Sequence, residues 1–515
     1  MNTLHSFAQH FLELFAVFFV LALGCLFVAV VYMYIADISQ TKQTIRHNYP
    51  VIGRFRYLFE TLGEFFRQYL FAQEREELPF NRALRSWVYR AAKNVDSTVA
   101  FGSTHPINQP GDFIFLNGLF PPLEDEILPL STIAFGEGYA RTPYTTTSFF
   151  NISAMSFGAL SAPAIRALSR GAKEAGIWLN TGEGAISPYH LEGGCDLVFQ
   201  IGTAKYGVRD DNHALCDEKL RELAAQEQVR MFELKLSQGA KPGKGGILPG
   251  AKVTAIIAST RGIPEGEDSI SPNRHPDINN IDDLLDMLHR IREVTGKPVG
   301  LKAVIGQSDW LDEMCERIQV RGLQYAPDFF TVDSADGGTG AAPQSLIDYM
   351  GLPVQRSLPL VVDKLVQYGL RDRVRVVCSG KLIHPAAVAA ALCLGADCVN
   401  SARGFMFALG CVQSLQCNRN TCPTGITTHD RDLQKGLDPT DKAHRVANYA
   451  RNLIREVEVF AHSCGLAEPK LFDRSHAQII SENCTPVPLR SLYPDAQVLP
   501  QYAVQAVPMA DRGAA

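Results

Sequence analysis

Eight short apolar runs alternate with helix-like segments through the middle of the chain, and this alternation constrains the fold more than any other feature. Buried strands that alternate with helices are typical of a parallel sheet whose faces the helices cover. Eight such units over residues 149–470 predict a (β/α)8 TIM barrel of the α/β class, and a doubly wound open sheet is the alternative. The runs span residues 149–155, 177–182, 197–203, 230–236, 298–304, 328–334, 374–380 and 397–403.

Glycine and polar residues gather where these runs end. Because the C-terminal ends of barrel strands meet on the face that carries the active site, we expect these residues to share one site. After the last two runs, small residues let backbone N–H groups approach a phosphate, and two cations supply charge. Tight turns without a ligand are the alternative. The predicted phosphate loops contain Ser379, Gly380, Lys381, Ala402 and Arg403, and the glycine pair Gly337 and Gly338 follows the sixth run.

Residues 237–250, SQGAKPGKGGILPG, combine glycines and prolines with amide and lysine side chains. This composition predicts a loop that is neither helix nor strand. It would present Gln238, Lys241 and Lys244 from a stiffened backbone. These side chains suit a carboxylate-bearing substrate or the negative charge of a reduced flavin, and a solvated surface loop is the alternative.

Three cysteines, Cys411, Cys417 and Cys422, lie within twelve residues in a Cys-x5-Cys-x4-Cys pattern that ends at Pro423. Disulfides are rare in a reducing compartment, and thiolates bind iron–sulfur clusters strongly. Three thiols without a fourth predict a [3Fe–4S] cluster. A zinc site with His429 as the fourth ligand is the alternative.

Residues 14–35 carry no charge and would form a helix of roughly 33 Å, which is long enough to cross a bilayer. A cleavable signal peptide is the alternative, but neither a basic start nor a small-residue cleavage site accompanies the run. Lys42 and Arg46 follow the run, whereas no Lys or Arg precedes it. The positive-inside rule therefore predicts a single-pass protein of the cell membrane with its catalytic domain in the cytoplasm.

These patterns divide the chain into five segments. Residues 1–36 form the expected transmembrane anchor and 37–95 a membrane-proximal helical linker, which either lies at the membrane interface or packs on the catalytic domain. Residues 96–148 are expected to wrap the barrel of residues 149–470, and residues 471–515 to form a C-terminal tail. The net charge of −5 and the lack of a basic stripe predict no binding to nucleic acid.

Residues from about 150 to 470 resemble the flavin-binding synthase domain of glutamate synthase. The matching stretches are SAMSFGALS (153–161), NTGEG (180–184), SQGAKPGKGG with LPG (237–250), DGGTGAAP (336–343), RDRVRVVCSGKL (371–382) and the cysteine loop that ends in CPTG. The resemblance implies FMN at the barrel mouth, with Met155, Ser156 and Gly158 along the flavin. It also places Gln238 and Lys302 against the ring system.

For the substrate, the resemblance implies 2-oxoglutarate or a similar keto acid. Glu183, Lys241 and Arg261 match positions around the 2-oxoglutarate and 2-iminoglutarate site. The two cations can pair with the two carboxylates, and Glu183 can orient or protonate the imine nitrogen. Electrons from a separate donor, either a ferredoxin, a flavoprotein or a quinol-linked partner, would pass through the cluster and FMN to the imine carbon.

Departures from the family pattern leave other functions open. A membrane span and a linker stand where large glutamate synthases carry an amidotransferase domain, so nitrogen would come as ammonia or from a separate amidotransferase. Ala185 follows GEG in place of an acidic residue, and Ile247 replaces a glutamine. A flavin oxidoreductase of another amino or imino acid, such as an N-alkylglutamate, is therefore an alternative. A membrane electron-transfer or assembly subunit is another.

Overall fold

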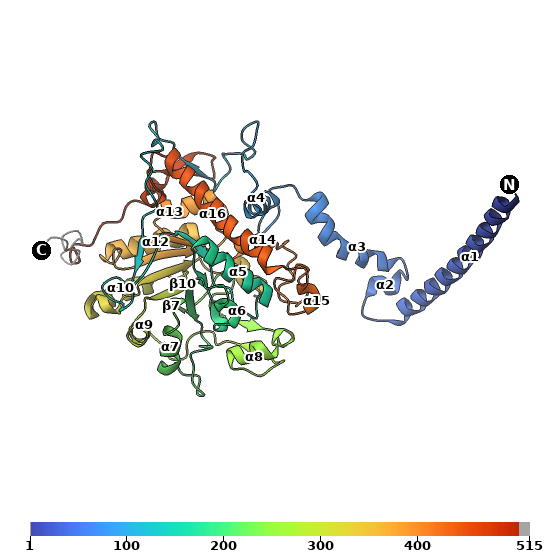
Figure 1. The fold of residues 1–515 in the computed structure, drawn as a ribbon, viewed down its shortest axis with the longest axis horizontal. Helices are drawn as coiled ribbons and strands as arrows, with labels where there is room; N and C mark the ends of the chain where they lie inside the picture. The colour runs from blue at the N-terminus through green and yellow to red at the C-terminus, as the bar shows by residue number, and fades with distance from the viewer. Residues whose placement is uncertain (1, 504–515) are drawn as a thin grey trace. The chain divides into compact units, whose positions relative to one another are not determined.

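The computed structural model describes residues 2–503 of the 515-residue chain (Figure 1). Residue 1 and the last part of the expected C-terminal tail, 504–515, lie outside the described residues. The chain forms two compact units, Met1–Ala83 and Leu84–Ala515.

A closed barrel of eight parallel strands forms the centre of the second unit, in the order β10-β11-β12-β13-β4-β5-β6-β7. The predicted TIM barrel is therefore confirmed, and each predicted apolar run contains one strand. Every residue of these strands except Arg230 and Arg375 is buried, because helices cover the outside and side chains fill the inside. The strands are β4 (Phe150–Ile152), β5 (Leu179–Asn180), β6 (Leu197–Ile201), β7 (Val229–Lys235), β10 (Val299–Val304), β11 (Phe329–Asp333), β12 (Arg375–Ser379) and β13 (Cys398–Ser401).

Helices surround the strands (Figure 1). The first barrel helix, α5, begins after Ser161, whose side chain accepts a hydrogen bond from the Ala164 N–H, and ends at the left-handed Gly176. A long helix that follows the eighth strand, α16, packs against α5, α13 and α14. The helices after β4 are α5 (Ala162–Ala175), α6 (Pro188–Leu191), α7 (Asp217–Ala224), α8 (Ala255–Arg261), α9 (Ile281–Thr295), α10 (Asp309–Arg321), α11 (Gln344–Tyr349), α12 (Val354–Gln367), α13 (Pro385–Cys393), α14 (Arg403–Leu409), α15 (Arg431–Gln434), α16 (Pro439–Ser463) and α17 (Leu489–Leu492), with 3-10 turns η2 (Gly182–Gly184), η3 (Gly250–Lys252), η4 (Leu323–Tyr325) and η5 (Pro469–Leu471).

A hairpin of β2 (Ile133–Phe135) and β3 (Tyr144–Thr146) covers the N-terminal end of the barrel. Phe135 is fully buried, and its ring lies 5.7 Å from those of both Trp178 and Phe329, which immediately precede or begin β5 and β11. The hairpin therefore closes the end of the barrel opposite the predicted active site.

Two smaller sheets complete this unit. β1 (Phe113–Phe115) pairs antiparallel with β14 (Ala477–Ile480), which pairs with β15 (Pro486–Pro488). The segment before the barrel is thus joined to the segment after it. The third pair, β8 (Ile247–Leu248) with β9 (Ser269–Ile270), lies in the loops after β7.

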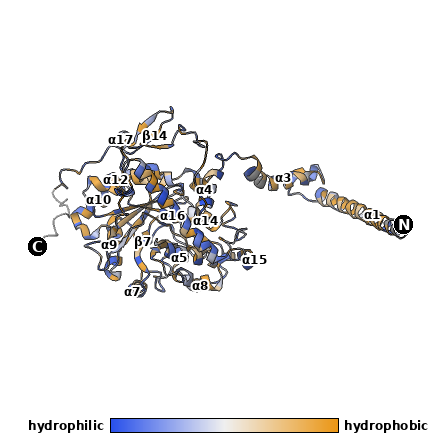
Figure 2. Cartoon of the chain, turned by 45° about the horizontal axis from the view of Figure 1, so that its top comes forward, coloured by the Kyte–Doolittle hydropathy of each residue, from blue (hydrophilic) through white to orange (hydrophobic). Residues whose placement is uncertain are grey.

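The first unit is helical, with α1 (Asn2–Ser39), α2 (Thr44–Asn48), α3 (Gly53–Phe66) and the π-helical turn η1 (Arg67–Phe71); α4 (Arg82–Ala92) spans the division between the units. Within the segment Gln9–Ser39 of α1, an 18-residue stretch has a mean hydropathy of 3.0, and Figure 2 shows hydrophobic colour along most of the helix. Among the described residues, this helix alone has the length and composition to cross a membrane, a test that a signal sequence also passes.

Candidate active site

Glu183 lies at the centre of the predicted substrate site. It belongs to the turn η2 that follows β5, and its Oε2 lies 2.9 Å from Nζ of Lys235 at the end of β7. Burial alone would raise the pKa of Glu183, but the charges of Lys235, Lys241 and Arg261 hold that pKa below its usual range. Glu183 is therefore a carboxylate at neutral pH.

Arg261, the last residue of α8, joins two of the predicted loops. Its Nη2 donates to the Phe157 carbonyl at 3.1 Å. A Cβ at either Gly158 or Gly184 would come within 2.9 Å of Nη2, so only glycines allow the guanidinium this position. The side chain is 6% exposed, and its Nε has no hydrogen-bond partner among the described residues. Burial lowers the pKa of Arg261, although the group stays charged.

Lys241 is the second buried cation beside Glu183. It is 5% exposed and follows Ala240, whose φ of 68° turns the backbone into the left-handed region. Burial lowers its pKa, whereas the charge of Glu183 acts in the opposite direction. Neither Lys241 nor Arg261 has a carboxylate within 4.0 Å in the described part of the chain, because Glu183 pairs with Lys235 instead. The site thus holds two buried positive charges without ion-pair partners.

The predicted loop over residues 237–250 is only partly irregular. Ile247 and Leu248 form β8, so the expectation of no strand in this loop is wrong for its last residues. Pairing with β9 fixes the backbone here, and a Cβ at Gly246 would lie 2.4 Å from Oε1 of Glu183. The loop backbone therefore packs directly on the Glu183 carboxylate.

Of the two residues expected at the flavin ring, Gln238 lies in the loop just after β7 and Lys302 lies within β10. Gln238 accepts a hydrogen bond from Lys235 Nζ at 2.7 Å. Lys302 Nζ lies 3.5 Å from Oδ2 of Asp333, and this carboxylate also accepts from the Gly239 N–H and from Ser379 Oγ. Burial would lower the pKa of Lys302, but nearby carboxylates, chiefly that of Asp333, raise it.

The sequence interpretation missed three charged residues that support these groups. Asp333 and Lys235 end their strands, and Glu233 lies inside the barrel, where it accepts from Asn180, Gln200 and Thr331. All three lie within the apolar runs that predicted strands. For Glu233 and Lys235 the signal was a pair of charged residues two positions apart in RMFELKL, because alternate side chains of a barrel strand point inward.

The predicted phosphate loops converge on Asp336. Lys381 Nζ lies 3.0 Å from Oδ2 of Asp336, and Arg403 Nη2 donates to the Asp336 carbonyl at 3.2 Å. A Cβ at Gly338 would lie 2.8 Å from Arg403 Nε. Next to these loops, Oδ1 of Asn400 is buried and has no hydrogen-bond partner among residues 2–503. An acceptor in that state fits a ligand that donates hydrogen bonds, such as one with hydroxyl groups.

The loop after β4 contains the other expected flavin residues. Met155 is buried, and the Gly158 backbone has φ of 104°, which favours glycine. A Cβ at Gly182 would lie 2.8 Å from the Ser156 nitrogen. The structure therefore brings Met155, Ser156 and Gly158 against the loop that carries Glu183.

The cysteine loop begins just after α14 and packs on this same segment. His429 Nε2 lies 2.9 Å from the Gly158 carbonyl, and Lys252 Nζ contacts the carbonyls of Ala159 at 2.9 Å and Cys417 at 3.4 Å. Cys411, Cys417 and Cys422 are not in disulfides. Among residues 2–503, no three His, Cys, Asp or Glu side chains are arranged to hold a metal ion. The cluster thus stays a prediction, and the Nε2 atom of His429 already contacts a backbone carbonyl.

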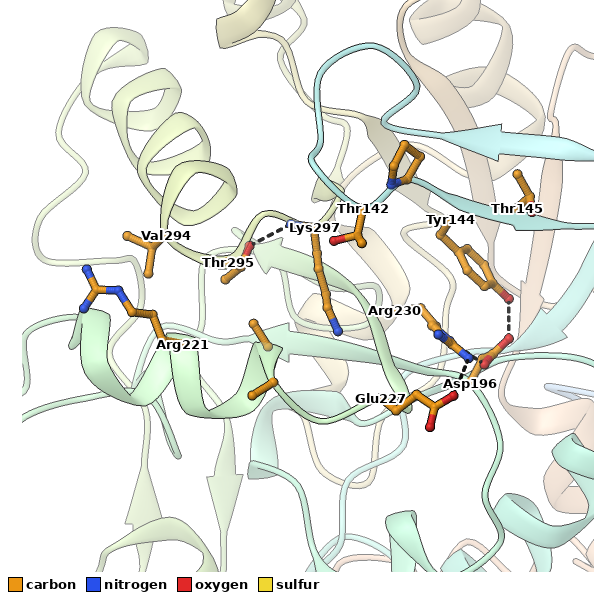
Figure 3. Close-up of a pocket in the computed structure, with 13 residues that line it drawn as sticks. Thr142, Tyr144, Thr145, Asp196, Arg221, Glu227, Arg230, Val294, Thr295 and Lys297 are labelled. Carbon is orange, nitrogen blue, oxygen red and sulfur yellow. Dashed lines mark hydrogen bonds and ion pairs between the residues drawn. The ribbon is translucent and has the colours of Figure 1, made fainter.

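A cavity of about 760 Å³ lies at the opposite end of the barrel, where β6, β7 and β10 begin (Figure 3). In this cavity, Asp196 accepts hydrogen bonds from the Tyr144 hydroxyl at 3.0 Å and from Arg230 at 2.8 Å. The charges of Asp196 and Arg230 therefore pair with each other. None of the predicted site residues lines this cavity.

Comparison with known proteins places these features in one family. The conserved region in glutamate synthase matches residues 134–467. The glutamate synthase large subunit-like protein YerD of Bacillus subtilis is 38% identical over 483 residues, which cover 86% of this chain and 91% of YerD. The archaeal-type glutamate synthase [NADPH] of Thermotoga maritima is 35% identical over 316 residues, or 61% of this chain and 59% of that protein.

A third relative, a glutamate synthase large subunit-like protein of Rhizobium meliloti, is 31% identical over 73% of this chain and 85% of its own length. The match therefore extends well beyond the short motifs around Glu183 and the cysteines. The chain belongs to the glutamate synthase family of oxidoreductases.

Proposed function

We propose that this protein is a membrane-anchored enzyme that reduces 2-iminoglutarate, formed from 2-oxoglutarate and ammonia, to L-glutamate. The observation that carries this proposal is the pair of buried cations, Lys241 and Arg261, which have no ion-pair partners among the described residues. Buried charges are costly unless they are paired, so the pair calls for a ligand with two negative charges. A five-carbon dicarboxylate supplies both.

Glu183 gives the substrate its orientation. Its lowered pKa keeps it ionised at neutral pH, so it accepts a hydrogen bond from the nitrogen of a protonated imine rather than donating its own proton. Lys235 holds the carboxylate in place from the other side. Glu183 between the two cations fits a substrate whose positive imine nitrogen lies between its own two carboxylates.

FMN is the proposed flavin, and when bound it supplies the hydride. Met155, Ser156 and Gly158 would contact it from one loop, and Gln238 and Lys302 would contact its ring system. The loops with Gly337, Gly338, Ser379, Gly380, Lys381, Ala402 and Arg403 would surround its phosphate. The unpaired Oδ1 of Asn400 supports this assignment, because the ribityl chain offers hydroxyl donors.

Cys411, Cys417 and Cys422 are the proposed ligands of a [3Fe–4S] cluster, which supplies single electrons when bound. The contacts of His429 and Lys252 with residues 158–159 support this placement, because they put the cysteine loop beside the proposed flavin. A separate donor would provide the electrons, and ammonia or a separate amidotransferase the nitrogen. The span in α1 would anchor the chain, with the basic residues after it in the cytoplasm.

The test uses the purified full-length protein with a chemical reductant, ammonium and 2-oxoglutarate, and measures L-glutamate. Lys241→Gln and Arg261→Gln should each raise KM for 2-oxoglutarate by about 10²-fold or more, as expected for a lost charge-assisted pair. Lys244, which the sequence predicted beside Lys241 as a possible anion ligand, is exposed in the structure, so Lys244→Gln is the matched control. Absence of glutamate with flavin and a three-iron EPR signal both present would refute the proposal.

One observation favours a second substrate class. Ile247 is 38% exposed and adjoins Gly246, whose backbone packs on Glu183. An apolar residue next to the backbone that packs on Glu183 suits an N-alkyl substituent, as in an N-alkylglutamate. Flavin absorbance against a panel of such compounds distinguishes the two: bleaching by N-alkylglutamates but not by glutamate would favour this class.

A further inference from the structure

The helix α3 has one apolar side that is largely exposed among the described residues of its own unit. Its apolar residues recur at the three- and four-residue spacing of one helix face, and we call them the α3 stripe. Phe59 is 62% exposed, Phe55 53%, Leu58 49% and Phe66 42%. The α3 stripe consists of Phe55, Leu58, Phe59, Leu62 and Phe66.

The opposite side of α3 is charged. Arg56 and Glu60 lie there and form an ion pair at 3.0 Å. From residue 37 to residue 67 the chain has five Lys or Arg and three Asp or Glu, which leaves a net charge of +2. A helix with exposed aromatic residues on one side and basic residues around it is typical of segments that lie in the interfacial layer of a membrane.

Asp37 ties the start of α3 to the last turns of α1. This carboxylate is fully buried within the first unit, and Oδ2 accepts from Arg54 Nε at 2.8 Å and from the Val51 N–H at 3.0 Å. Its Oδ1 accepts from Arg46 Nε at 2.8 Å. Because Asp37 lies where the apolar residues of α1 end, these bonds hold the first turn of α3 at the same depth as the end of the span.

We propose that α3 lies in the headgroup layer of the bilayer that α1 crosses, with the α3 stripe against the acyl chains. This inference rests on the proposed membrane span. Three observations favour a lipid surface as the partner of the α3 stripe. They are the bond between Arg54 and Asp37, the exposed aromatic side chains and the net positive charge of residues 37–67.

The test uses full-length protein in vesicles of phosphatidylcholine and phosphatidylglycerol, with lipids brominated either near the headgroup or near the bilayer centre. Phe59→Trp places an indole on the α3 stripe, and Tyr57→Trp places one on the other side of the same helix. Emission from Trp87, Trp178 and Trp310 is subtracted with the unsubstituted protein. We expect headgroup-proximal bromine to cause loss of the added emission in Phe59→Trp but not in Tyr57→Trp. Leu62→Trp and Thr61→Trp repeat the comparison.

Phe18→Trp, in the middle of α1, separates this inference from the proposed span. Its emission should be lost with lipids brominated near the bilayer centre, and no loss would refute the span itself. Loss at Phe18→Trp with equal quenching at Phe59→Trp and Tyr57→Trp would overturn only the interfacial helix. A blue shift of Phe59→Trp emission without bromine quenching would show that protein covers the stripe, and would also overturn it.

Discussion

Glu183 carries its charge beside three cations, and only Lys235 lies within ion-pair distance. The other two, Lys241 and Arg261, also lower the pKa of Glu183, because charges interact strongly across the low dielectric of the protein interior. The same two cations are the ones proposed to bind the substrate carboxylates. The ionisation of Glu183 is thus coupled to whether an anion is bound at Lys241 and Arg261.

Replacement of Glu183 by Gln keeps the size of the side chain and removes its charge. We expect kcat to fall by about 10²–10³-fold with flavin content unchanged, because the neutral amide no longer offers a charged acceptor to the positive imine nitrogen. Glu192→Gln is the control, since that part-exposed carboxylate pairs with Arg166 and Arg170 instead. Steady-state glutamate formation measures both, and equal rates for the two variants would exclude a role for Glu183.

Lys241 predicts how substrate affinity depends on pH. Burial lowers its pKa, so the ammonium loses its proton at a lower pH than a free lysine does. The affinity for 2-oxoglutarate should therefore be highest below the pKa of Lys241, where the ammonium is protonated, and should fall as the pH rises through that pKa. Spectral titration of the oxidised flavin without ammonia measures this affinity, and Lys241→Arg should move the loss to higher pH. An unchanged profile in Lys241→Arg would assign the titration to another group.

At the residue scale, motifs singled out residues that the structure brings together. Glu183, Lys241 and Arg261 meet because their loops all follow strand ends, which a barrel brings to one face. Asp333, Lys235 and Glu233 could not be assigned, because a charged residue inside an apolar run does not reveal which strand its partner comes from. The pairing of Lys235 with both Glu183 and Gln238 depends on strand order and on the depth at which each strand ends.

At the element scale, α9 is bound to the barrel through a buried ion cluster. Asp328, just before β11, is fully buried and accepts from Arg292 Nε at 2.8 Å and from the Val299 N–H at 2.7 Å, while Arg373 lies 2.9 Å away. Arg292 lies in the last turn of α9. The cluster ties a helix end to the starts of β10 and β11.

Arg292→Met should therefore destabilise the protein by about 1.5–3 kcal/mol, because the buried carboxylate loses one charged donor and keeps Arg373. Arg290→Met, two residues earlier on the same helix, breaks a part-exposed pair with Asp217 and should cost about 0–1 kcal/mol. Chemical denaturation followed by far-UV circular dichroism compares the variants. Similar losses for both would show that the cluster adds no more than a surface pair.

The eight strands were predictable because strands buried on both faces are apolar throughout, and each run lies between helical patterns. The hairpin of β2 and β3 and the short pair of β8 and β9 were not. β8 has only two residues within a glycine-rich loop, so local composition indicated irregular structure there. Its pairing with β9 is a tertiary contact that no local pattern signals.

At the scale of the whole molecule, the chain divides between Ala83 and Leu84 into a helical unit and a barrel unit. The barrel unit contains every residue proposed to contact substrate or cofactor. Deletion of residues 2–36 should therefore move the protein from the membrane fraction to the supernatant without changing flavin per polypeptide. Flavin absorbance and fractionation after ultracentrifugation measure both quantities, and loss of flavin would show that the barrel needs the helical unit.

The position of the β2–β3 hairpin in the sequence affects how the protein folds during its synthesis. Phe135 leaves the ribosome before any barrel strand, yet its partners Trp178 and Phe329 belong to strands made later. Contacts between residues far apart in sequence form late, because the intervening chain must first be ordered. The hairpin that closes the barrel is thus among the first parts to be synthesised and among the last to pack. Until it packs, the apolar side chain of Phe135 stays exposed.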